Sequence, residues 1–185
     1  MGEELIVAGV DEVGRGALFG PVFAAAVVYR ENRIPEGIKD SKKLTPRQRE
    51  NFFEIIEKTA EDISVSFVSN FEIDEKNIQY ANIKCMREAV LGLKKDFNIV
   101  YVDGYKIRDL PYEQRVIIKG DERIPVIAAA SIVAKVLRDR LLIHFSRFFP
   151  EYRLYKNKGY GTREHREAVF KFGRTLFHRT SFKIN

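Results

Sequence analysis

The sequence predicts an α/β fold in which a mixed five-stranded sheet is flanked by helices. Five apolar or alternating runs have the length and composition of strands: residues 5–10, 22–28, 63–67, 98–102 and 114–119. A tight glycine-rich turn joins the first two runs into an antiparallel hairpin. A helical pattern separates the third run from the fourth, which can therefore lie parallel to its neighbours. Both kinds of connection in one chain predict a mixed sheet.

The predicted helices are each marked by a local signal. Thr45 is placed to cap a helix over residues 46–60, because proline suits the first helical position and Gln48 completes a capping box. Apolar residues at helical spacing predict a second helix over residues 74–95. A third, from residue 125 to about 148, is apolar nearly all round in its first half, so it must be buried against the sheet.

The chain shows no internal repeat, low-complexity tract or long linker. A single catalytic domain over residues 1–185 is therefore expected, with a core over about 1–148. The remainder, about 149–185, is expected to be a small helical part in which Thr162 caps a short helix that ends near Phe172.

The net charge of +6 is unevenly distributed along the chain. Residues 135–185 hold thirteen Lys or Arg against four Asp or Glu, a net +9, which leaves −3 for the rest. A basic surface of this kind favours nucleic acid as partner. The single Cys85 cannot form an internal disulfide and is expected to be a packing residue in a reducing compartment. With an acidic N-terminus and no long apolar run, we expect a cytoplasmic protein without membrane contact.

Four carboxylates stand where predicted strands end. Asp11 and Glu12 follow the first apolar run, Asp103 follows the fourth, and Asp121 follows the fifth. Because the carboxyl ends of parallel strands meet at one edge of a sheet, we expect the acids to converge on one site. An ordinary turn is the alternative for each acid alone, since Asp and Gly are common turn residues. Recurrence at three strand ends favours the shared site.

These acids indicate the chemistry of the expected site. Four carboxylates without a cluster of Cys or His favour a hard cation such as Mg²⁺ over zinc. The three histidines, His144, His165 and His178, are isolated in sequence and are expected to be surface or packing residues. Two bound ions would activate a water and stabilise the leaving oxygen of a phosphodiester. The residues therefore predict metal-dependent hydrolysis of a nucleic-acid backbone.

The turn between the first two strands is rich in glycine. Gly14, Gly16 and Gly20 have the spacing G-x-G-x-x-x-G, and neither a Gly-Lys-Ser/Thr string nor a helix follows. A Rossmann unit and a P-loop are therefore excluded. Flexible backbone beside a carboxylate pair suits a phosphate backbone that must come close.

Three more polar residues are candidates for the site. Ser131 and Lys135 stand four residues apart and so share one face of the long helix. Lys42 lies in a polar loop. A solvated loop is the alternative for Lys42, and incidental positions on the helix are the alternative for the pair.

Several strings occur in a fixed order along nearly the whole chain. They are Asp11-Glu12-Val13-Gly14-Arg15-Gly16 with Gly20-Pro21, Asp103-Gly104, Lys119-Gly120-Asp121, Ala129-Ala130-Ser131-Ile132 with Ala134-Lys135, Lys158-Gly159-Tyr160 and His178-Arg179-Thr180-Ser181-Phe182. This set resembles ribonuclease HII, the type 2 ribonuclease H family. Arg15 favours type 2, because the related type 3 enzymes usually carry Gly-Lys-Gly. The segment Ala17-Leu18-Phe19 is bulkier than the commoner family version and is expected to shift the hairpin without touching the acids.

The resemblance implies an RNase H-like fold and a defined reaction. It implies that Asp11, Glu12, Asp103 and Asp121 form the catalytic cluster for Mg²⁺ or Mn²⁺. It implies incision on the 5′ side of a ribonucleotide embedded in duplex DNA, which leaves 3′-hydroxyl and 5′-phosphate ends, and cleavage of RNA in RNA–DNA hybrids. A monomer is expected.

The resemblance also assigns substrate contacts. Gly14-Arg15-Gly16 matches the segment that meets the 2′-hydroxyl through backbone groups, and Tyr160 matches the tyrosine that packs on the sugar at the RNA-to-DNA junction. Lys42, Ser131 and Lys135 fall in family-like strings and are expected to contact phosphate or support the site. The C-terminal part is expected to contribute to substrate binding.

Two other classes of function remain open to test. A non-catalytic nucleic-acid binder on the same fold would keep the basic C-terminal region while losing acids, and all four acids are present. A metal hydrolase acting on small molecules would not need a basic, aromatic-bearing C-terminal region. Both features together favour the nuclease.

Overall fold

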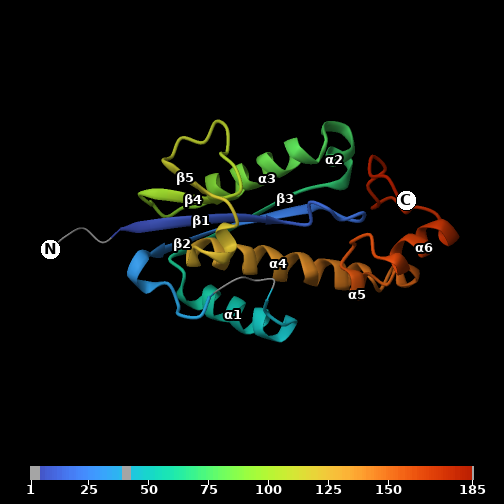
Figure 1. The fold of residues 1–185 in the computed structure, drawn as a ribbon, viewed down its shortest axis with the longest axis horizontal. Coiled ribbons are helices and arrows are strands. Elements are labelled where there is room, and N and C mark those ends of the chain that lie inside the picture. Colours follow the sequence, from blue (N-terminus) through green and yellow to red (C-terminus); the bar gives the residue numbers. More distant parts are fainter. Residues whose placement is uncertain (1–4, 39–42, 185) are drawn as a thin grey trace.

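The computed structural model of the chain describes residues 5–38 and 43–184, where helices cover both faces of a mixed sheet (Figure 1). The strands are β1 (Ile6–Val13), β2 (Val22–Arg30), β3 (Asp62–Val68), β4 (Ile99–Asp103) and β5 (Gln114–Ile117). The helices are α1 (Pro46–Thr59), α2 (Asn70–Lys76), α3 (Ile78–Leu91), α4 (Pro125–Phe145), α5 (Leu154–Asn157) and α6 (Arg163–Phe172). The strand order is β3-β2-β1-β4-β5, with β1 antiparallel to β2 and parallel to β4. The predicted mixed five-stranded sheet is confirmed.

The central strand β1 is buried on both faces because its side chains alternate between two helical layers. Val7 packs in the cluster that includes α4, whereas Ala8 and Val10 pack in the cluster that includes α3. Gly9 lies against the start of α4, where an added Cβ would stand 2.4 Å from the carbonyl carbon of Val126. A glycine is therefore required for α4 to lie directly on the backbone of β1.

The long apolar helix is buried as predicted. Residues 126–134 of α4 are buried all round, with β1 and β2 on one side and α1 on another. The helix ends at Phe145 rather than near residue 148, and the following turns bring Phe149 against Phe19 of the hairpin. Among the residues that the structure describes, no helix is long and apolar enough to cross a membrane.

The predicted cap of α1 is confirmed, whereas the prediction of one continuous helix over residues 74–95 was wrong. The side chain of Thr45 caps α1 and forms the predicted capping box with Gln48. The helix predicted over residues 74–95 is instead two helices, α2 and α3. Asn77 separates them, because it adopts a φ of 90° and its side chain accepts a hydrogen bond from the backbone N–H of Tyr80. Periodicity alone does not reveal such a break.

Cys85 is a packing residue in the core between α3 and the sheet, as predicted. Its Sγ lies 3.3 Å from the carbonyl oxygen of Ser66 and 3.7 Å from that of Val22. Burial raises the pKa of the thiol to about 12, so the thiol stays protonated at neutral pH.

The C-terminal part packs on the tip of the β1–β2 hairpin, at the end of the molecule away from the N-terminus (Figure 1). Phe19 at this tip is fully buried in a cluster with Leu142 of α4 and Tyr152. The side chain of Thr162 caps α6, as predicted, by accepting a hydrogen bond from the backbone N–H of His165. The hairpin tip is therefore held between α4 and the C-terminal part.

Candidate active site

Three of the four predicted acids lie at one cleft, about 410 Å³ in volume, beside the central strands. Asp11 and Glu12 do not follow β1, as the sequence suggested, but lie within it, because β1 stays paired with β2 as far as Val13. Asp103 is the last residue of β4, which runs parallel to β1 with Val102 opposite Val10. Parallel pairing therefore brings these acids together, as predicted.

Asp11 and Glu12 reach the cleft from opposite faces of the sheet, because consecutive side chains of a strand alternate. Asp11 accepts a hydrogen bond from the Ser131 hydroxyl on α4, and one of its carboxylate oxygens accepts from the Glu12 backbone N–H at 2.7 Å. Glu12 interacts instead with the side chain of Asn82 on α3. The two helical layers thus hold one acid each.

The cleft concentrates negative charge in a buried place. Burial, followed by the charges of Glu12 and Asp103, holds the pKa of the Asp11 carboxyl well above its usual range. Burial and the charge of Asp103 also raise the pKa of Glu12, against an opposing hydrogen bond from Asn82 and the charge of Arg15. Such carboxylates repel one another, and a cation bound among them would lower that repulsion.

The donor set fits a hard divalent cation, because Mg²⁺ and Mn²⁺ prefer carboxylate oxygens. Asp11, Glu12 and Asp103 would hold it. Among residues 5–38 and 43–184, no three acidic, His or Cys side chains stand close enough together to hold a metal ion by themselves. A cation held here would also need water or substrate oxygens as ligands, as Mg²⁺ commonly takes.

Asp121 lies beside this cleft rather than in its lining. The strand predicted over residues 114–119 ends at Ile117, because Lys119 adopts a φ of 55° and a 3-10 turn follows. The backbone N–H of Gly120 donates to Asp103 Oδ1 at 2.7 Å, so the turn is fixed next to the acids. The Asp121 side chain is buried and lines a neighbouring cavity of about 430 Å³. Three of the four acids therefore converge on one cleft, as expected, and the fourth, Asp121, lines the neighbouring cavity.

The predicted substrate residues that the structure describes line the same cleft: Gly14, Arg15, Gly16, Ser131, Lys135 and Tyr160. Gly14 needs its glycine, since its φ is 90°. At Gly16 an added Cβ would meet no atom within 4 Å, so this backbone is open to an approaching group. Lys135 pairs with Asp139 at 2.7 Å, and burial lowers the pKa of its ammonium group. Lys42 lies outside the described residues.

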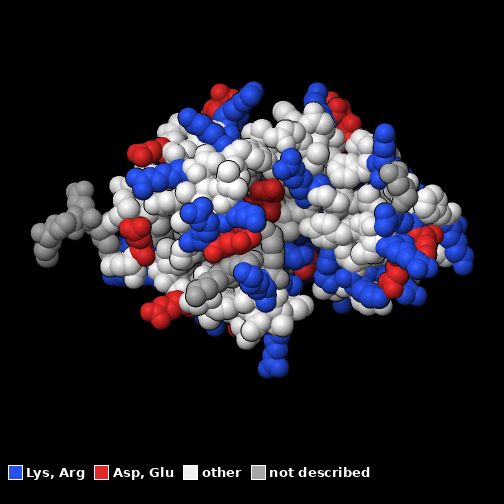
Figure 2. Space-filling model, viewed as in Figure 1, with Lys and Arg blue, Asp and Glu red and all other residues white. Residues whose placement is uncertain are grey.

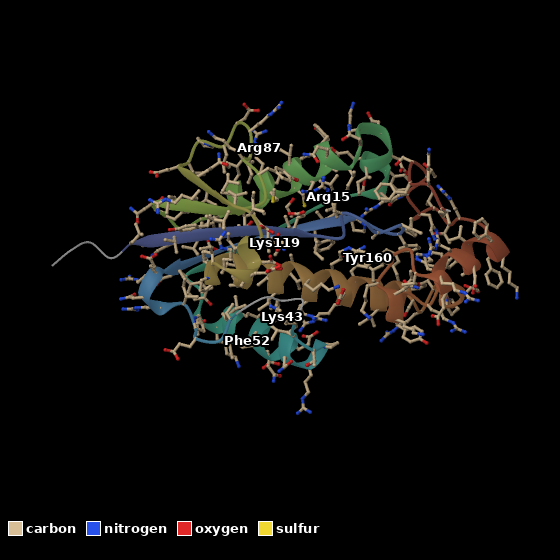
Figure 3. All side chains as sticks on the ribbon, viewed as in Figure 1. Arg15, Lys43, Phe52, Arg87, Lys119 and Tyr160 are labelled. Atoms are coloured by element: carbon tan, nitrogen blue, oxygen red, sulfur yellow. The ribbon has the colours of Figure 1, made fainter. Side chains whose placement is uncertain are left out.

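The arrangement of charge around the cleft suits an anionic polymer. Figure 2 shows carboxylate groups in a hollow near the middle of one face, with basic side chains on both sides. Figure 3 places Arg15 on the α3 side of the hairpin and Tyr160 on the α4 side. The Arg15 guanidinium donates to Gln79 Oε1 of α3 at 2.8 Å, whereas Lys135 Nζ of α4 lies 5.6 Å from the centre of the Tyr160 ring.

Some residues of the site escaped the sequence reasoning. Arg49 lines the cleft from α1, and Asn82 contacts Glu12 and the hydroxyl of Tyr105. Neither belongs to a recognisable string. Arg138 is fully buried beneath the hairpin, and its spacing of seven residues from Ser131 on the same helix was the available signal.

Two histidines that are isolated in sequence pack together in the C-terminal part. The Nε2 atoms of His165 and His178 lie 3.1 Å apart, and both side chains are buried. The Thr175 backbone N–H donates to Nδ1 of His178, so His178 carries its proton on Nε2 and His165 can donate from Nδ1 to the carbonyl of Tyr160. Burial lowers the pKa of His178 to about 4. The expected packing role is confirmed for this pair, and His144 lies on the surface.

Comparisons with known proteins agree with this geometry. The family model for ribonuclease HII matches residues 8–185. A ribonuclease HII from Caldicellulosiruptor bescii is 52% identical over 179 residues, which cover 97% of this chain and 87% of the relative. RNase HII of Archaeoglobus fulgidus, solved in complex with PCNA, has a TM-score of 0.84 at 32% identity and covers 98% of this chain and 96% of its own. Bst-RNase HIII in complex with Mn²⁺ shares the fold, with a TM-score of 0.73 at 18% identity over 97% of this chain and 67% of its own.

The sheet order and the acids on the central strands define a nuclease of the RNase H fold. The chain belongs to the ribonuclease HII family. Members of this family are ribonuclease H enzymes, that is, divalent-metal-dependent endonucleases that act on RNA–DNA hybrids. The predicted family, fold class and enzyme class are therefore confirmed.

Proposed function

We propose that the chain hydrolyses the phosphodiester on the 5′ side of a ribonucleotide embedded in duplex DNA, and also cuts the RNA strand of RNA–DNA hybrids. The products are 3′-hydroxyl and 5′-phosphate ends. One observation carries the proposal: Asp11, Glu12 and Asp103 share a single cleft with the Gly14–Gly16 turn and Tyr160. A nucleotide bound in this cleft would therefore meet both the proposed hydrolytic acids and the groups suited to sense a ribose.

The proposed catalytic residues are Asp11, Glu12, Asp103 and Asp121, which would also hold Mg²⁺ or Mn²⁺. A bound ion of this kind supplies an activated water and charge stabilisation for the leaving oxygen. The protein's own contribution is orientation: the Ser131 hydroxyl and the Glu12 backbone N–H fix the Asp11 carboxylate before substrate arrives. Support for including Asp121 comes from the bond between its neighbour Gly120 and Asp103.

The proposed substrate contacts divide between ribose and phosphate. The 2′-hydroxyl is the group that distinguishes RNA from DNA at one nucleotide, and the open backbone at Gly16 allows it to approach closely. The ring of Tyr160 tests the next sugar. Lys42, Ser131 and Lys135 contact phosphate or support the site.

The proposal also covers the binding of the duplex, the oligomeric state and the cellular compartment. The basic part over about 149–185 contributes to duplex binding within a single catalytic domain, because phosphate contacts dominate affinity for nucleic acid. We propose that the protein acts as a monomer in the cytoplasm. Light scattering of the free protein at working concentration tests the monomer, and a dimeric mass would refute it.

The decisive experiment for this function maps a cut. The protein is incubated with Mg²⁺ and a labelled duplex that contains one ribonucleotide, beside an all-DNA duplex and a reaction with EDTA. A nick on the 5′ side of the ribonucleotide, absent from both controls, is expected. A nick on the 3′ side, or cutting of the all-DNA duplex, would refute the proposed specificity.

A further inference from the structure

Arg138 is a fully buried arginine whose partners are backbone carbonyls. Its Nε donates to the oxygen of Pro21 at 3.1 Å, Nη2 to that of Phe19 at 3.1 Å, and Nη1 to that of Lys158 at 2.8 Å. Within the described residues it forms no ion pair, since the adjacent Asp139 pairs with Lys135 instead. Burying a charge costs free energy. An arginine at this position is therefore explained by its donation to three carbonyls at once, which a neutral side chain cannot provide.

The segments that Arg138 joins are those that carry the proposed ribose contacts. Phe19 and Pro21 follow the Gly14–Gly16 turn, and Lys158 precedes Tyr160. An added Cβ at Gly14 would stand 2.1 Å from Arg138 Nε, so the turn lies directly on the guanidinium. The Arg138 Cζ atom also lies 5.4 Å from the centre of the Tyr160 ring. One side chain therefore touches both ribose-facing elements.

Arg179 also holds the same hairpin through backbone carbonyls. Its Nη1 donates to the carbonyl oxygen of Arg15 at 2.9 Å, and its Nε donates to that of Gly20 at 3.0 Å. In a trans peptide the C=O and the following N–H point in opposite directions. Because the Arg15 carbonyl is turned toward the buried Arg179, the Gly16 N–H is turned away from it.

The hairpin and the Tyr160 segment are also bonded to each other. The Leu18 N–H donates to the carbonyl of Gly159 at 2.8 Å, and Ala17 forms a β-bridge with Tyr160. These bonds set the distance between the segments, and the two guanidiniums set the direction of the peptide groups. A lysine cannot replace either arginine in this role, because a point-like ammonium lacks the planar fork that reaches several carbonyls.

We propose that Arg138 and Arg179 are positioning residues for ribose selection. They fix the Gly14–Gly16 turn against Tyr160, so that the Arg15–Gly16 peptide and the tyrosine ring meet the same RNA-to-DNA junction. This inference rests on the proposed function. It assigns selectivity to two buried side chains that do not themselves touch the substrate.

The test compares two substrates for each variant, Arg138→Lys and Arg179→Lys. The value of kcat/KM is measured on a duplex with one ribonucleotide and on a long RNA–DNA hybrid. On the single ribonucleotide we expect a loss of about 100-fold, mainly in kcat, as displacement of a positioned group by about 1 Å produces. On the hybrid, where no junction has to be read, the loss is expected to be at least about 10-fold smaller.

Arg140→Lys is the matched control, because Arg140 lies on the same helix but is exposed and pairs with Glu50. It should leave both rates unchanged. Equal losses on both substrates would overturn the proposal whether or not Tm falls, since a general structural role predicts no selectivity. Full activity of both lysine variants would overturn it equally.

A milder variant covers the case in which a lysine variant does not fold. Phe182→Leu removes only the ring that lies 5.0 Å from the Arg179 Cζ atom. The ratio of kcat/KM on the single ribonucleotide to kcat/KM on the hybrid is expected to fall, but less than in the lysine variants. An unchanged ratio would overturn the proposal. Failure of the proposed function is distinguishable from all these outcomes, because the wild type would then leave the single-ribonucleotide duplex intact.

Discussion

Replacing Asp11 by asparagine is expected to stabilise the metal-free protein. Asp11 is only 5% exposed, and burial together with the charges of Glu12 and Asp103 holds the pKa of its carboxyl well above the usual range. The folded state therefore binds a proton more tightly than the unfolded chain, and ionisation at neutral pH costs stability. Asparagine removes the charge and keeps an oxygen that can accept the Ser131 hydrogen bond.

The size and sign of the effect follow from this geometry. Relief of one buried charge is expected to raise the free energy of unfolding by about 2 kcal/mol, which for a chain of this size raises Tm by roughly 4–8 °C. Wild-type stability falls as pH rises from the unfolded pKa toward the raised folded pKa. The Tm difference between variant and wild type should therefore shrink as pH is lowered toward about 4.

Thermal unfolding followed by circular dichroism in EDTA measures this difference. Asp74→Asn is the matched control with the opposite sign, because the Asp74 carboxylate accepts hydrogen bonds from the backbone and side chains of Thr180 and Ser181. It should lower Tm. If Asp11→Asn melted at or below the wild-type temperature at neutral pH, the cleft would not be electrostatically strained, and the case for a cation among these acids would weaken.

Three further predictions concern the reaction and the duplex. Asp103→Asn is expected to abolish cleavage in Mg²⁺ while largely sparing duplex binding in a gel-shift assay, and a wild-type cleavage rate would remove Asp103 from the site. Tyr160→Ala is expected to reduce kcat/KM on a single embedded ribonucleotide about 10-fold more than on a long hybrid. Equal losses on the two substrates would contradict the junction role. Duplex affinity measured by anisotropy should fall steeply with added salt, and a salt-independent Kd would argue against phosphate contacts from the basic part over about 149–185.

Local signals were sufficient for much of the fold. The capping box at Thr45 and the apolar first half of α4 depend on residues close in sequence, and both predictions are confirmed. The break at Asn77 was not predictable from periodicity, because a positive φ leaves the apolar spacing on either side unchanged. The strand β5 ends earlier than predicted for a similar reason, because the backbone of Lys119 adopts a left-handed conformation that the residue pattern does not reveal.

The site was predictable where strand topology decides it. Asp11 and Asp103 meet because β1 and β4 are parallel neighbours, which a helix between two strands already implies. The partners of Arg138 and Arg179 were not predictable, although Arg179 stands in a family-like string and Arg138 lies seven residues from Ser131. These partners are backbone carbonyls, in most cases more than 100 residues away in sequence. Because every residue has a backbone carbonyl, the residue types do not indicate which one an arginine will bind. His165 and His178 likewise meet only through the folding of the C-terminal part.

Moving the ribonucleotide tests the assignment of the cleft most directly. Two duplexes of identical sequence carry their single ribonucleotide at neighbouring positions, and the cut is mapped in each with Mg²⁺. Joint action of the acids and the Gly14–Gly16 turn on one nucleotide predicts that the nick moves with the ribonucleotide and stays on its 5′ side. A nick that stays at one position, or that appears in a duplex without a ribonucleotide, would contradict this joint action.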